Sequence, residues 1–111
     1  FGGVKLDIAG AGSWTDGSDT YAYNNSAGSG CTSGQMTVSG GSFLQTAGAN
    51  TPTYTLHGGA FSGATPVTLL NNTSITAWEG ELTGYTLSQK IPAEQADGNY
   101  TLSLTISAIA Q

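Results

Sequence analysis

Apolar and polar residues alternate along most of this chain, and this period of two constrains the fold more than any other feature. The longest example runs from 99 to 110, where threonines and serines occupy one face. The opposite face carries Tyr100, Leu102, Leu104, Ile106 and Ala108. Successive side chains of a β-strand point to opposite faces, so this alternation is typical of a strand with one buried side. Helical periodicity is almost absent, and the sequence therefore predicts an all-β protein.

Shorter alternating runs are separated by glycine, proline and asparagine, which are turn-forming residues. Strands are expected at 4–8, 21–23, 35–39, 42–46, 53–57, 66–70, 74–79 and 82–91. Gly40 and Gly41 separate two of these runs, and two strands joined by a two-residue glycine turn form a β-hairpin. About eight short strands at this spacing, with the run at 99–110, predict an antiparallel β-sandwich or barrel.

Charge is scarce, since 8% of the residues are charged against about 25% in an average protein. Lys5 and Lys90 are the only basic residues, against seven acidic ones, so we expect no nucleic-acid partner. No apolar run approaches the roughly 18 residues of a membrane span. Cys31 is the single cysteine, which excludes a miniprotein stapled by disulfides. The abundance of threonine, serine, glycine and asparagine favours a secreted or surface-displayed protein.

The length of 111 residues corresponds to one domain. We expect 1–9 to form an N-terminal strand or arm. The rest, 10–111, is expected to form a single β-sandwich domain, and a Gly/Ser-rich loop is expected at 9–34. A start at Phe1-Gly2-Gly3 is what processing of a precursor would leave.

Residues that could carry catalysis do not form a known motif. The lone His57 rules out a metal site with several histidines. Asp16 and Asp19 have oxygens that suit Ca²⁺, but their spacing is not that of an EF-hand, and an Asx turn is the preferred interpretation. We therefore expect a protein that is not an enzyme and needs no cofactor and no metal.

Two sets of residues could contact or carry sugars. Aromatic side chains offer flat faces to the apolar side of a sugar ring, and the candidates for such contact are Trp14, Tyr21 and Tyr23. The acceptor motif for N-linked glycans, Asn-x-Ser/Thr, occurs four times, at Asn24, Asn71, Asn72 and Asn99. The first set predicts a surface that binds glycans, and the second predicts sites of modification.

The segment Ile91–Tyr100, IPAEQADGNY, leads into the alternating run TLSLTIS. This tail resembles the end of bacterial pilin-like domains of the spore coat protein U and archaic chaperone–usher type. The run Gly3–Ile8, GVKLDI, resembles the alternating amino-terminal segment of the same family. That family usually has a disulfide that links an early strand to a later one, and this chain departs from the pattern with its single Cys31.

The resemblance implies an incomplete Ig-like sandwich that a strand from a neighbouring subunit completes. An alternating donor strand supplies main-chain hydrogen bonds and fills pockets with every second side chain. The donor residues would be Val4, Leu6 and Ile8, and the acceptor or core strand would carry Tyr100, Leu102, Leu104 and Ile106. The residues alone leave a second interpretation open, in which 4–8 is the first strand of its own sandwich.

Three functions follow as hypotheses. The first is a structural subunit of an extracellular pilus-like filament, whose partners are copies of itself and a periplasmic chaperone and usher. The second is a carbohydrate-binding or adhesive module that uses its exposed aromatic residues to bind surface glycans. The third is a viral or phage decoration domain, which shares this composition.

Overall fold

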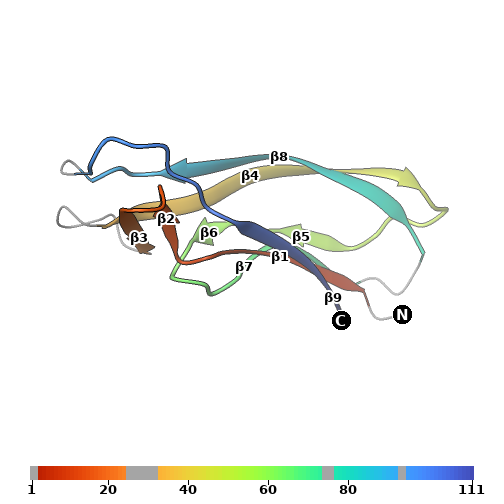
Figure 1. Cartoon of the computed structure of the whole chain (residues 1–111). Coiled ribbons are helices and arrows are strands. Elements are labelled where there is room, and N and C mark those ends of the chain that lie inside the picture. Colours follow the sequence, from red (N-terminus) through yellow and green to blue (C-terminus); the bar gives the residue numbers. More distant parts are fainter. Residues whose placement is uncertain (1–2, 25–32, 74–76, 93–94) are drawn as a thin grey trace.

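The computed structural model describes residues 3–24, 33–73, 77–92 and 95–111 of the chain. These residues form nine strands and no helix, in an elongated body of 53 × 24 × 20 Å (Figure 1). The strands are β1 (Val4–Gly10), β2 (Ser13–Thr15), β3 (Thr20–Asn24), β4 (Ser33–Ala47), β5 (Tyr54–Leu56), β6 (Gly59–Ala60), β7 (Val67–Asn72), β8 (Glu79–Gln89) and β9 (Leu104–Ala110). The expectation of an all-β protein is confirmed.

The first sheet has four strands in the order β5-β7-β1-β9, and every pair in it is antiparallel. Its two central strands are β7 and β1. On one side β1 pairs with β9 over its full length, from Val4 opposite Ala110 to Gly10 opposite Leu104. On the other side it pairs with β7. The segment expected as a strand or arm is, from Val4 onward, an inner strand of the first sheet.

The second sheet follows the order β2-β3-β4-β6, and β8 also pairs with β4. The β4–β8 pairing is antiparallel and long, from Met36 opposite Gln89 to Ala47 opposite Glu79. The two strands run side by side along one layer of the molecule, and the first sheet forms the other layer (Figure 1). The pair β3–β4 is parallel, which departs from the expected antiparallel arrangement.

The hairpin predicted at Gly40-Gly41 is wrong, because the chain continues through both glycines as the single strand β4. Both have positive φ, 86° and 102°, so they bend the strand without reversing it. A Cβ at Gly41 would lie 2.6 Å from the ring of Tyr85 on β8. Glycine at this position therefore allows an aromatic ring to pack directly against the backbone. The sequence alone does not distinguish a glycine needed for such packing from a glycine needed for a turn.

The core lies between the two sheets, and strands of both contribute to it. Its buried members are Ile8, Tyr23, Met36, Val38, Phe61 and Leu69. The rings of Tyr23 and Phe61 meet edge to face, with their centroids 6.0 Å apart. Two sheets that share one core are consistent with a β-sandwich. Within the described residues there is no helix long and apolar enough to cross a membrane.

Candidate functional site

The slot that holds β1 is the first candidate site. All the ladder partners of β1 come from β7 and β9, which lie more than 50 residues further along the chain. Its neighbour in sequence, β2, belongs to the other sheet. β1 is also the only strand that pairs with β9 in the part of the chain that the structure describes. Without β1, the first sheet would separate into the β5–β7 pair and a lone β9.

One face of β1 forms the floor of an apolar groove of about 380 Å³. Leu6 and Ile8 contribute to this floor, together with Leu69 from the neighbouring strand β7 and Val38 from β4 in the opposite sheet. The sides of the groove are residues 82–85 of β8 and Ile106 of β9. No described strand pairs with the outer edge of either β8 or β9. The sandwich is therefore open along this side, and Ile106 is 64% exposed.

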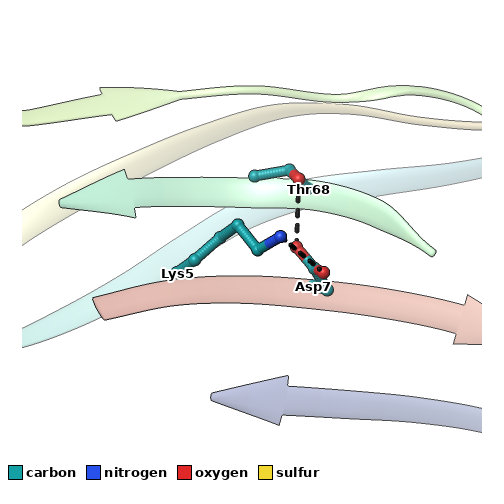
Figure 2. A network of polar contacts seen from close by, with 3 residues as sticks. All are labelled: Lys5, Asp7 and Thr68. Carbon is teal, nitrogen blue, oxygen red and sulfur yellow. Dashed lines mark hydrogen bonds and ion pairs between the residues drawn. The ribbon is translucent and has the colours of Figure 1, made fainter. Parts of the chain in front are cut away.

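The opposite face of β1 carries a small polar network, seen between β1 and β7 in Figure 2. Asp7 is buried, with 7% of its surface exposed. Its carboxylate accepts a hydrogen bond of 3.0 Å from Thr68 Oγ1 on β7 and lies 3.4 Å from the ammonium group of Lys5. A buried carboxylate is costly unless it is paired in this way. The network therefore ties β1 to one register on β7.

A short glycine-containing link joins β1 to β2. Gly10 is required by close contact, because a Cβ there would lie 2.2 Å from the Tyr23 hydroxyl. Gly12 has a φ of +102° and donates its N–H to the same hydroxyl over 2.8 Å. Beyond the link, Thr15 and Thr101 exchange two backbone hydrogen bonds of 3.1 and 2.8 Å. The link is thus held at a point where a left-handed glycine changes the direction of the chain.

The residues predicted to line the acceptor strand lie in three different surroundings. Tyr100 and Leu102 precede β9, which begins at Leu104, and Leu102 packs against the core. Leu104 and Ile106 lie on β9 and are 41% and 64% exposed. Tyr100 lies at the other end of this segment, in a pocket with two other aromatic residues. Of the three predicted donor residues, Ile8 is buried and the other two are half-buried.

That pocket is the second candidate site, with a volume of about 300 Å³. Trp14 of β2 and Tyr21 of β3 line it, so the structure brings two of the three predicted sugar contacts together. Gln89, at the end of β8, and Gln95 add polar groups. The third predicted contact, Tyr23, points elsewhere and is buried in the core. The sequence does not identify Gln89 and Gln95 as site residues. They are distant in sequence from Trp14 and Tyr21, and only the fold brings the four residues together.

Asp16 lies beside this pocket at the β2–β3 turn. Its Oδ1 accepts the backbone N–H groups of Ser18 and Asp19 over 2.9 and 2.7 Å, so the predicted Asx turn is present. These hydrogen bonds from Asp19 and Ser18 lower the pKa of the Asp16 carboxyl. Among the described residues, no group of three or more histidine, cysteine, aspartate or glutamate side chains could hold a metal ion.

The predicted glycan acceptors differ in accessibility. Asn99 is exposed, and Asn24 and Asn71 are half-buried. Asn72 is fully enclosed, and its side-chain amide donates to the Thr53 carbonyl over 3.1 Å. A glycan cannot be attached to Asn72 while the chain is folded. Cys31 lies outside the described residues, as does most of the predicted Gly/Ser-rich loop beyond Asn24.

No protein-family model, curated protein or solved structure matches this chain. The features of the molecule that bear on its function are therefore the β1 slot, the open groove and the aromatic pocket.

Proposed function

We propose that this protein is the structural subunit of an extracellular, pilus-like filament whose copies are joined by the exchange of β1. In this assembly, β1 of one copy occupies the slot between β7 and β9 of the next copy. The observation that carries the proposal is the slot itself, which pairs both edges of an alternating strand with distant parts of the chain. An exchanged strand makes the same contacts in either copy, so the exchange has a low equilibrium cost.

Exchange in one direction produces a fibre. A copy that gives β1 to the next and receives β1 from the previous one repeats a head-to-tail contact, which extends without limit unless the rotation closes a ring. The finer fold that belongs to this proposal is an Ig-like sandwich that is incomplete without β1. A periplasmic chaperone would occupy the slot before assembly, and an usher would guide the exchange.

Two further features support this proposal. The net charge of −5 is small enough to limit repulsion between stacked copies. The tail at 91–107 resembles that of pilin-like domains, which assemble by strand donation.

Electron microscopy and sedimentation of the purified chain test the proposal, with a synthetic peptide of residues 3–10 as a competitor. We expect filaments, and we expect excess peptide to shorten them because it fills the slot of the end subunit. A control peptide, in which asparagine replaces both Leu6 and Ile8, should have little effect. Low concentrations of urea should accelerate assembly, since β1 must leave its own slot first.

Two outcomes would contradict the proposal. One is a chain that remains monomeric at every concentration, with and without urea. The other is a filament whose length is the same with the residue 3–10 peptide and with the control peptide, which would indicate association through outer surfaces.

A further inference from the structure

Two of the strands that line the aromatic pocket, β2 and β3, lie at the end of the molecule opposite the start of β1 and the end of β9 (Figure 1). The walls of the pocket come from β2, from β3, from the start of β4, from the end of β8 and from the segment that joins β8 to β9. None of the lining residues belongs to β1, β7 or β9. The pocket is therefore separate from the slot used for filament assembly, and it would remain available in a filament.

The aromatic side chains of the pocket are held in place by hydrogen bonds. The Trp14 indole N–H donates to the Gln89 side-chain oxygen over 3.0 Å. The rings of Tyr21 and Tyr100 meet edge to face at 5.4 Å. The Tyr21 hydroxyl accepts the backbone N–H of Ala96, and the Tyr100 hydroxyl donates to the carbonyl of the same residue. The pocket is thus organised before a ligand arrives, which lowers the entropic cost of binding.

A polar group in the pocket remains available to a ligand. Within the part of the chain that the structure describes, the Gln95 side chain makes no hydrogen bond. Its amide offers both donors and an acceptor. Aromatic walls with a few polar groups are the usual lining of a small-molecule site, and about 300 Å³ is at the lower end of the size range for such sites.

The charge around the pocket selects against anions. Asp16 reaches the pocket wall, because its Oδ2 lies 2.5 Å from the position that a Cβ at Gly98 would take. Burial, with the neighbouring Tyr21 and the Asp16 and Asp19 carboxylates, raises the pKa of Tyr100 to about 12. The basic residue closest in sequence to the lining residues is Lys90, which follows Gln89. Lys90 itself does not line the pocket. A ligand with its own negative charge would be repelled here.

We infer that this pocket binds one ring of a neutral sugar, which stacks on Trp14 and Tyr21 and hydrogen-bonds to Gln95. The aromatic faces suit the apolar face of a pyranose. The Gln95 amide can pair with a sugar hydroxyl, which is also both a donor and an acceptor. A filament of such subunits would present the pocket many times, and weak single contacts would then add through multivalency.

Binding of the purified chain to immobilised glycans and to free monosaccharides tests the inference. We expect binding to neutral glycans and at least tenfold weaker binding to sialylated or uronate-containing ones. Trp14→Ala should reduce affinity at least tenfold. Gln95→Ala should reduce it severalfold without altering the circular dichroism spectrum, because that side chain supports no other described residue. Tyr54→Ala, an exposed aromatic residue on β5, is the matched control and should leave affinity unchanged.

Several outcomes would overturn the inference. They are the absence of binding to any neutral sugar, a preference for acidic sugars, and affinity that both pocket variants retain in full. Binding of choline in place of sugars would show that the rings form a cage for cations. Each of these results would leave the filament proposal intact, because none of the substituted residues lies in the β1 slot.

Discussion

Thr68 on β7 donates a hydrogen bond of 3.0 Å to the buried carboxylate of Asp7 on β1 (Figure 2). The register between the two strands shifts at this point, since Leu6 lies opposite Leu70 and Asp7 lies opposite Thr68. A slip of one residue would turn Asp7 toward the core and Leu6 away from it. The pair therefore specifies how any copy of β1 must sit in the slot.

Replacing Thr68 with valine should lower the free energy of unfolding by about 1–3 kcal/mol, because the buried carboxylate loses a hydrogen-bond donor. Urea denaturation measures this change. Thr55→Val on β5 is the matched control, because the exposed Thr55 makes no comparable contact, and its effect should stay within about 0.5 kcal/mol. Equal effects of the two substitutions would show that Asp7 does not depend on Thr68.

Phe61 should be a major contributor to the stability of the core. It is fully buried against Tyr23 in the space between the sheets. Phe61→Ala should lower the free energy of unfolding by about 3–5 kcal/mol, which is typical of a large cavity in a packed core. Leu44→Ala removes a side chain that is 64% exposed and should cost far less. A loss of stability for Phe61→Ala as small as that for Leu44→Ala would contradict the assignment of Phe61 to the core.

The two glycines with similar backbone angles should respond differently to alanine. Gly17 and Gly41 have φ values of 100° and 102°. A Cβ at Gly17 meets nothing within 4 Å, whereas one at Gly41 meets the Tyr85 ring at 2.6 Å. Gly17→Ala should therefore cost about 1–2 kcal/mol from the backbone alone, and Gly41→Ala about 1–3 kcal/mol more from the clash. Thermal unfolding of the two variants measures both losses of stability. A larger loss for Gly17→Ala than for Gly41→Ala would contradict this prediction.

Stability should fall at alkaline pH. The pKa of Tyr100 is about 12 in the folded chain, mainly because of burial, and burial also raises the pKa of Tyr85. In the unfolded chain both return to about 10. The folded state thus holds these protons more tightly, so stability is complete below pH 10 and is lost as the pH rises toward 12. Urea titrations across this range should show a shallower decline in Tyr100→Phe than in Tyr54→Phe, and identical slopes would contradict this account.

The alternation of residues was enough to predict the class of fold, because it depends only on which side chains share a strand face. The short strands β2 and β6 were not predicted, since three and two residues are too few to show a period. Gly40 and Gly41 are a turn signal in the sequence, but pairing with the long strand β8 keeps both within the single strand β4. Whether the two glycines form a turn or continue a strand depends on pairing with a distant segment, and the local sequence carries no information about that pairing.

The candidate sites could be predicted only in part. Residue type and a polar neighbourhood are enough to identify Trp14 and Tyr21 as candidates, and the pocket contains both. Tyr23 has the same residue type and a similar neighbourhood, yet its place on the strand turns it into the core. Asp7 occupies one of the polar positions of an alternating strand, so in the sequence it resembles an ordinary solvated charge. Its burial follows from the packing of β7 beside it.

The exchange of β1 can be tested most directly with disulfide bonds between two different variants. Leu6 and Ala108 lie directly opposite each other on β1 and β9, and facing residues on antiparallel strands are within the range of a disulfide. Leu6→Cys and Ala108→Cys are prepared as separate proteins, each also carrying Cys31→Ser, and are then mixed, assembled and oxidised. The same two substitutions combined in one chain serve as the control for β1 in its own slot.

Exchange predicts covalent dimers that contain one copy of each variant, because β1 of one chain then lies beside β9 of another. The account would be contradicted if the mixture yields no such dimers while the doubly substituted chain forms its disulfide internally, since β1 would then remain in its own sheet.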